Sequence, residues 1–210
     1  MGLVLFGSAG TLRWPAGWVY LAESHLGGLA IGLWLARYSP GLLAERLRPP
    51  VQRAQKKWDK ILVSFMLALW FGWLALMAAD AARFRISLVP TLLQVLGALA
   101  VAISMYLVFL VFRANPFAAS VVKIQEERGH SVITTGPYHL VRHPMYAGII
   151  PYLLGVPLLL GSWLGLALVP FLIVVLGIRI VLEERTLRTE LESYDAYAAD
   201  VRYRLVPHIW

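Results

Sequence analysis

The sequence GPYHLVRHPMY at residues 136–146 leads into an apolar run, AGIIPYLLGVPLLLGSWLGLALVPFLIVVLGIRI, at residues 147–180. At 1.5 Å per residue, one helix of this length is longer than the hydrocarbon core of a bilayer, which is about 30 Å thick. Gly161-Ser162-Trp163 interrupts the run with turn-forming residues. We therefore predict two membrane-spanning helices joined by a tight turn, with a polar block before the first helix.

The rest of the chain has the composition of a membrane protein. Of its 210 residues, 59% are hydrophobic and 15% are charged, whereas soluble domains carry about 25% charged residues. Three further apolar runs, at about residues 16–36, 61–79 and 88–112, reach the roughly 20 residues that a transmembrane helix needs. The sequence predicts an all-α polytopic integral membrane protein with about five transmembrane helices.

The distribution of basic residues predicts the orientation. Residues 37–60 contain seven lysines and arginines, which is typical of a cytoplasmic connection. This places the 113–145 loop and the tail from Arg179 in the cytoplasm and the N-terminus outside. The net charge of +7 is then explained by basic loops beside anionic membrane lipids, and we expect no nucleic-acid partner.

The polar block at residues 136–146 has the pattern of a helix start at the membrane surface. His143 precedes a proline and is disfavoured in a helix, whereas Pro144 suits the first helical position. Met145 and Tyr146 would lie in the first turn, where free N–H groups and the helix dipole favour an anion. The block therefore predicts a site for a carboxylate or phosphate group of a ligand. The plainer alternative is a polar cap over the helix ends.

Two histidines of the block, His139 and His143, have the i, i+4 spacing that metal ligands use on a helix. Gly136-Pro137 and Pro144 argue against a helix across them. The chain has no cysteine, and no carboxylate nearby completes a ligand set. We expect no metal site, no disulfide and no cysteine nucleophile.

A second polar block closes the apolar run. Arg179 and Glu183 are four residues apart and share a helix face, while Glu184 points elsewhere. One reading is an ion pair worth a few tenths of a kcal/mol. The other is a ligand site at the membrane interface, where Glu183 would hold an amine and the Arg179 guanidinium an acidic group. With an amine acceptor, Glu183 or Glu184 would take the proton.

Two further features stay open at this stage. Glu23 and His25 lie within the first span, and ionisable residues inside a membrane mark functional sites unless they sit at its solvated edge. The aromatic, basic tail from Tyr194 either lies on the membrane surface or covers the site.

The two blocks together resemble the isoprenylcysteine carboxyl methyltransferase family, and the related phospholipid methyltransferases share much of the pattern. The resemblance rests on QEERGH at 125–130, GPY at 136–138, RHPMY at 142–146, RIVLEERTL at 179–187 and YDAY at 194–197. It covers about residues 113–207. It implies an integral membrane enzyme that uses S-adenosyl-L-methionine without a Rossmann domain and holds this cofactor at the cytoplasmic face.

The resemblance also implies a set of site residues. Arg179 matches the family's substrate-side arginine, and we assign Arg179, Glu183 and Glu184 to catalysis. The cofactor residues would be Gln125, His130, Ser131, Val132, Ile133, Tyr138, His143, Pro144, Met145, Tyr146 and Glu183. Within one membrane domain, 1–210, residues 1–112 would form a three-helix scaffold and residues 113–207 the methyltransferase-like half.

These inferences predict an S-adenosylmethionine-dependent methyltransferase acting on a lipophilic or membrane-embedded acceptor, with a carboxylate favoured. A phospholipid amine and a small thiol are the alternative acceptors. A transporter or a subunit of a larger membrane assembly is the non-enzymatic alternative. Transport would call for charges inside the spans, for which only Glu23 and His25 qualify, and neither half of the chain is an inverted copy of the other. The sequence does not set the oligomeric state.

Overall fold

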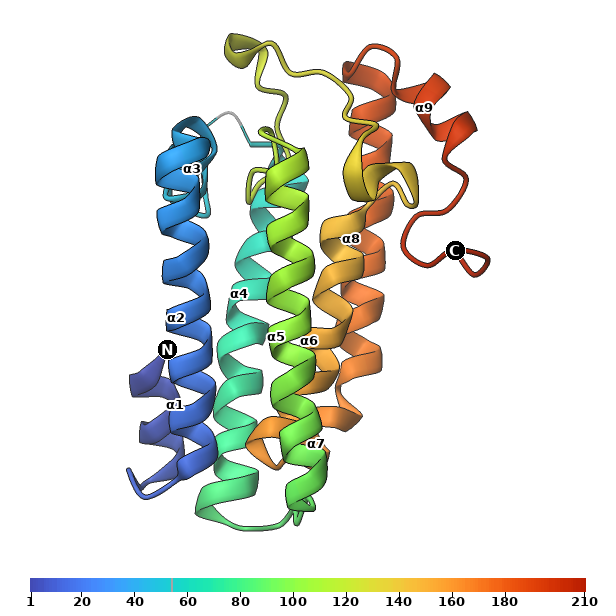
Figure 1. Ribbon diagram of the computed structural model, residues 1–210. Helices are drawn as coiled ribbons and strands as arrows, with labels where there is room; N and C mark the ends of the chain where they lie inside the picture. The colour runs from blue at the N-terminus through green and yellow to red at the C-terminus, as the bar shows by residue number, and fades with distance from the viewer. Residues whose placement is uncertain (54) are drawn as a thin grey trace. The chain divides into compact units, whose positions relative to one another are not determined.

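The computed structural model describes residues 1–53 and 55–210, and the regular structure within them is helical. Residue 54, inside the predicted basic connection, lies outside this description. Figure 1 shows the helices in chain order. They are α1 Gly2–Ala9, α2 Pro15–Tyr38, α3 Pro40–Arg46, α4 Lys57–Ala78, α5 Thr91–Ala114, α6 Pro144–Leu160, α7 Trp163–Ala167, α8 Val169–Glu190 and α9 Tyr194–Asp200.

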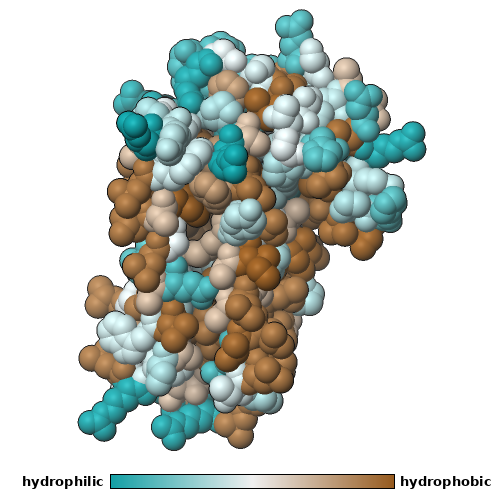
Figure 2. Space-filling view, in the orientation of Figure 1, coloured by the Kyte–Doolittle hydropathy of each residue, from teal (hydrophilic) through white to brown (hydrophobic). Residues whose placement is uncertain are grey.

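Long apolar helices confirm the predicted fold class. Four segments are long and apolar enough to cross a membrane, namely Pro15–Tyr38, Lys57–Arg83, Thr91–Ala114 and Trp163–Glu190. A shorter apolar helix, Pro144–Leu160, is the fifth. Figure 2 shows mostly hydrophobic side chains over the helices, with hydrophilic ones gathered toward the helix ends. The protein is thus an all-α polytopic membrane protein.

The predicted break in the C-terminal hairpin is also confirmed. α6 ends at Leu160, and Gly161 follows with a φ of 86°, a left-handed conformation that favours glycine. The Ser162 hydroxyl then caps α7 by accepting a hydrogen bond from the Gly165 N–H.

The chain divides into two compact units. Unit 1 comprises Met1–Ile31, Phe65–Met105 and Ile149–Val174, and unit 2 comprises Gly32–Ser64, Tyr106–Gly148 and Val175–Trp210. The helices α2, α4, α5, α6 and α8 each contribute residues to both units.

Close helix packing holds unit 1 together. A Cβ added at Gly97 of α5 would lie 2.4 Å from the Leu159 nitrogen and 2.6 Å from the Gly155 oxygen of α6. The two backbones are therefore in direct contact, which only small residues permit. The buried Trp73 indole N–H donates to the Gly165 oxygen at 2.8 Å and so fastens α7 to α4.

The ionisable residues of the first span differ in their surroundings. The Glu23 side chain is partly buried, and its Oε2 atom has no hydrogen-bond partner among the described residues. His25 is exposed, and its Nδ1 lies 2.7 Å from the Leu21 oxygen of the same helix. Neither residue belongs to unit 2, which holds the site described below.

A completely buried carboxylate organises unit 2. The Asp59 side chain of α4 accepts hydrogen bonds from Arg179 Nε at 3.1 Å, Gln55 Nε2 at 2.8 Å and the Val122 N–H at 2.8 Å. It therefore ties α8 and the loop after α5 to the start of α4. Because a buried charge is stable only when paired and hydrogen-bonded, these contacts fix the loop in place.

The short helix α3 supports the same loop. Arg46 donates to the Ala118 oxygen at 2.9 Å, and its guanidinium lies 4.3 Å from the centre of the Phe112 ring. Burial lowers the pKa of Arg46 to about 10. Glu45 pairs with Lys123 at 2.5 Å, and both side chains are buried.

Candidate functional site

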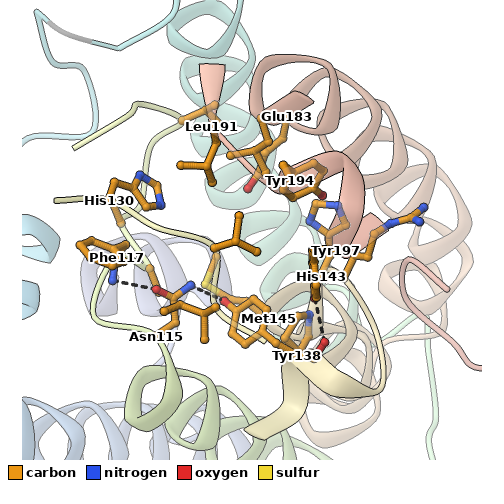
Figure 3. A pocket seen from close by; sticks show the side chains of 18 of the residues that line it. Asn115, Phe117, His130, Tyr138, His143, Met145, Glu183, Leu191, Tyr194 and Tyr197 are labelled. Carbon is orange, nitrogen blue, oxygen red and sulfur yellow. Dashed lines mark hydrogen bonds between the residues drawn. The ribbon is translucent and has the colours of Figure 1, made fainter. Parts of the chain in front are cut away.

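A polar cavity of about 110 Å³ lies within unit 2. Its wall is formed by the loop after α5, the polar block that leads into α6, the end of α8 and α9. Figure 3 shows these segments with their side chains turned toward a common space. The two sequence blocks that are separated by the apolar hairpin thus meet in one site.

Most of the predicted cofactor residues line this cavity. They are His130, Ser131, Val132, Ile133, Tyr138, His143, Pro144, Met145, Tyr146 and Glu183. Gln125 does not line it. Its side chain is buried, donating from Nε2 to the Phe117 oxygen at 2.8 Å and accepting from Arg128 Nη1 at 2.5 Å. Gln125 therefore shapes the loop that carries Phe117 and His130.

The start of α6 differs in part from the expected anion site. The N–H groups of Arg142 and His143 are occupied, since they donate to the Tyr203 and Arg204 oxygens at 2.9 Å each. Pro144 has no N–H group. The first-turn residues Met145 and Tyr146 line the cavity, so the helix start faces it through these two residues.

Glu183 is the acidic residue of the cavity wall. Its Oε2 accepts a hydrogen bond from the Tyr146 hydroxyl at 2.5 Å. The Arg179 guanidinium lies 5.8 Å from the centre of the Tyr146 ring. Arg179 itself is absent from the described cavity wall, and its ion pair is with Asp59 at 3.1 Å rather than with Glu183.

Glu184 is absent from the cavity wall and contacts two arginines and a histidine instead. Its carboxylate accepts hydrogen bonds from Arg142 Nε at 2.7 Å, His143 Nε2 at 3.2 Å and Arg204 Nε at 2.8 Å. The residue is buried. This cluster joins α8 to the polar block and to the C-terminal tail, so Glu184 positions two residues of the wall.

Tyrosines and an asparagine close the other side of the cavity. Asn115 Nδ2 donates to the Tyr138 hydroxyl at 2.7 Å, and the Tyr197 hydroxyl donates to the Tyr138 backbone oxygen at 2.8 Å (Figure 3). Burial raises the pKa of Tyr138 and raises that of Tyr197 to about 12. Both hydroxyls therefore stay protonated near neutral pH.

An aromatic surface lies beside these groups. The His130 ring packs on Phe117 with 4.6 Å between ring centres and 30° between ring planes. Burial lowers the pKa of His130, and the charge of Arg128 lowers it further. A neutral imidazole and a phenyl ring thus present an aromatic surface, with the Arg128 guanidinium 5.5 Å from the centre of the Phe117 ring, and this surface suits a planar heteroaromatic ring.

The C-terminal tail, whose place the sequence leaves open, forms part of the wall. Tyr194 and Tyr197 of α9 are buried and line the cavity. Arg142 holds the helix end by donating from Nη1 to the Ala198 and Val201 oxygens at 3.1 Å each. The sequence analysis did not assign Asn115, Phe117, Tyr194 or Tyr197 to the site, although the YDAY motif had singled out the two tyrosines.

An apolar groove of about 660 Å³ also lies within unit 2. Its floor comes from the last turns of α5, including Leu107 and Leu110, and from Ala147 of α6. Pro144 lines both the groove and the cavity. Arg113 and His139 lie at the groove as exposed polar groups.

The fold and site define a class before any comparison: a helical integral membrane protein with a cavity and an apolar groove that share Pro144 in their walls. Residues 92–193 match the phospholipid methyltransferase family, which is related to the isoprenylcysteine carboxyl methyltransferases. The match agrees with the resemblance seen in the motifs and points to a membrane methyltransferase. It includes every described residue of the cavity wall except Tyr194 and Tyr197. No curated protein matches the chain.

Proposed function

We propose that the protein transfers the methyl group of S-adenosyl-L-methionine to a lipophilic acceptor in the membrane, and that a carboxylate is the favoured acceptor group. The observation that carries the proposal is that Pro144 lines both the cavity, which holds the polar groups, and an apolar groove. A water-soluble methyl donor and a lipid acceptor need such a pair of compartments.

The donor set of the cavity fits the proposed cofactor. The Phe117–His130 surface suits the adenine ring, Glu183 suits the amino group, and the helix start at Met145 and Tyr146 suits the carboxylate. Because ligand pockets usually measure about 300–1,000 Å³, we expect the 110 Å³ cavity to widen on binding. α9 is the wall segment best placed to move, since the connection between α8 and α9 is short and exposed.

The groove supports an acceptor with a long apolar chain. Its lining is mostly aliphatic, and a small thiol would leave this surface uncovered. We propose that the acceptor's polar end reaches the cavity past Pro144. Arg179 lies 5.8 Å from the centre of the Tyr146 ring and outside the described cavity wall, so it would orient an acidic acceptor after a shift into the cavity.

The bound cofactor supplies a methyl group on a sulfonium cation. Transfer to a carboxylate neutralises charge, so the water-poor wall formed by buried Tyr194, Tyr197 and Val121 would favour it. A carboxylate acceptor needs no base. A phospholipid amine, the second candidate, would lose a proton, and Glu183 is the carboxylate on the cavity wall that could take it. Glu184 is held by two arginines and by His143 and suits a positioning role better.

Transfer of a labelled methyl group separates these acceptors. Purified protein in nanodiscs made from a total lipid extract would be incubated with methyl-tritiated S-adenosylmethionine, and the lipid fraction then treated with mild alkali. A methyl ester releases volatile tritiated methanol, whereas N-methyl and S-methyl groups survive. We expect alkali-labile label. Alkali-stable label would favour the amine, and no label in the lipid fraction would contradict a lipid acceptor.

We also propose that the site faces the cytoplasm and the N-terminus lies outside, as the basic residues of 37–60 indicate. The absence of cysteine makes single-cysteine variants informative. In sealed cells, a membrane-impermeant maleimide should label Thr11→Cys and spare Arg202→Cys. The reverse pattern would overturn the orientation.

A further inference from the structure

A second open cleft, of about 690 Å³, lies within unit 1 and has no part in the proposed reaction. It is bounded by the end of α1 with the turn that follows, and by the π-helical turn Ala79–Arg83 that ends the α4 span. Three arginines line it: Arg13 from the first segment, and Arg83 and Arg85 from the second.

The positive charge of this cleft is uncompensated. All three arginines are exposed, and none forms an ion pair among residues 1–53 and 55–210. The acidic residues of unit 1 are Glu23 and Asp80, and neither lines the cleft. Asp80 is buried and accepts from the Ser87 and Ser162 hydroxyls at 2.6 and 2.5 Å. Three arginines therefore line one cleft without an acidic side chain in its described wall.

The backbone holds two of these arginines on one closed turn. Arg85 has a φ of 52°, a left-handed conformation that is uncommon for a residue with a side chain. The turn is closed on both sides of it, because the Phe84 N–H donates to the Ala79 oxygen at 2.8 Å and the Ile86 N–H to the Asp80 oxygen at 3.0 Å. Arg83 and Arg85 are thus held on a defined turn and not on a loose loop.

Apolar side chains flank the arginines. Leu12, Phe84 and Ile86 are each about two-thirds exposed, at 66%, 65% and 66%. The cleft lies where candidate spans end, at Arg83 and just before Pro15, which is the depth of lipid head groups. Guanidinium groups bind phosphate oxygens in pairs of parallel hydrogen bonds.

We propose that this cleft binds a phosphate group, supplied by an anionic phospholipid whose acyl chains cover the flanking apolar residues. Free phosphate offers the same chemistry to the arginines but would leave Leu12, Phe84 and Ile86 uncovered. The site would act independently of methyl transfer, since it shares no residue with the cavity in unit 2.

Native mass spectrometry of the detergent-solubilised protein tests the proposal. Phosphatidylglycerol, zwitterionic phosphatidylcholine and inorganic phosphate would be titrated separately into the wild type, Arg83→Gln/Arg85→Gln and Arg13→Gln. The control Arg37→Gln/Arg202→Gln removes the same charge from exposed arginines of unit 2. We expect the wild type to bind one phosphatidylglycerol molecule tightly. Both cleft variants should bind it at least tenfold more weakly, and the affinity of the control should stay within twofold of the wild type.

The other outcomes are equally definite. If inorganic phosphate binds the wild type tightly and this binding is lost in the cleft variants, the result would support the phosphate site and overturn a lipid as the source of the phosphate. Equal loss in the cleft variants and the control would mean nonspecific attraction to positive charge and would overturn the site. Retention of phosphatidylglycerol by Arg13→Gln and by Arg83→Gln/Arg85→Gln would also overturn it. Arg13→Gln keeps the test valid if the double variant fails to fold.

Discussion

Asp59 is the residue on which the site most depends, although it lies outside the family match at 92–193. It is fully buried, and its three donors come from α8, from the residues just before α4 and from the cavity loop. Its charge balances Arg179 where water is absent. The N-terminal part of the chain therefore completes a site whose motifs all lie in the C-terminal half.

Replacing Asp59 by Asn tests this dependence. The variant keeps the shape of the side chain but leaves the buried Arg179 cation unpaired, which we expect to lower the free energy of unfolding by about 3 kcal/mol or more. Asp195→Asn is the matched control, because Asp195 pairs with Arg188 on the surface and exposed pairs contribute little. Thermal unfolding in detergent measures both. Equal unfolding of Asp59→Asn and the wild type would contradict the assigned role.

His130 predicts a pH dependence. Its pKa in the folded protein is lowered by burial and by Arg128, so folding favours the neutral ring. The resulting stabilisation is complete above the unfolded pKa of about 6.5 and is lost as the pH falls through the lower folded value.

We therefore expect the unfolding temperature to drop between pH 7 and pH 5, and to drop less in His130→Gln. The exposed His139 provides the control variant, His139→Gln, which should follow the wild type. A wild-type profile that is flat over this range, or one that is unchanged in His130→Gln, would show that His130 does not carry the effect.

At the scale of elements, α9 is held against the polar block by apolar packing, by the bond from the Tyr197 hydroxyl to the Tyr138 oxygen and by Arg142. Tyr197→Phe removes the first of these, a neutral hydrogen bond worth about 1 kcal/mol. We expect cofactor binding to weaken roughly fivefold in calorimetric titrations, because about 1.4 kcal/mol corresponds to tenfold. Tyr203→Phe, which loses only an exposed contact to His208, should bind like the wild type. Identical affinities would mean that α9 does not close the cavity.

Local sequence signals predicted the elements that depend on local chemistry. The apolar runs gave the spans, Gly161 and Ser162 marked the hairpin turn, and Pro144 marked the start of α6. The positions of Asp59, Gln125 and α9 in the site depend on tertiary contacts between distant segments. No hydrophobic periodicity or motif spacing in the sequence predicts the contact between Asp59 and Arg179, because 120 residues separate them. The spacing of Arg179 and Glu183 suggested an ion pair between these two residues. In the structure Arg179 pairs with Asp59 instead.

At the scale of the whole molecule, the proposed function requires that two sequence blocks form one site. The two blocks predicted to act together, at 136–146 and 179–184, both contribute to the cavity wall, through Tyr138, Tyr146 and Glu183. The groove beside Pro144 was not predicted, because its walls are ordinary aliphatic residues. These residues form a groove only when α5 and α6 lie side by side.

Equilibrium binding of S-adenosylmethionine tests the central claim most directly. Isothermal titration calorimetry would compare the wild type with Glu183→Gln, which removes the carboxylate of the cavity wall, and with Glu192→Gln, an exposed carboxylate beyond α8. The account predicts saturable binding by the wild type, at least tenfold weaker binding by Glu183→Gln, and unchanged binding by Glu192→Gln. Absence of saturable binding by a wild-type protein whose circular dichroism shows intact helices would contradict it.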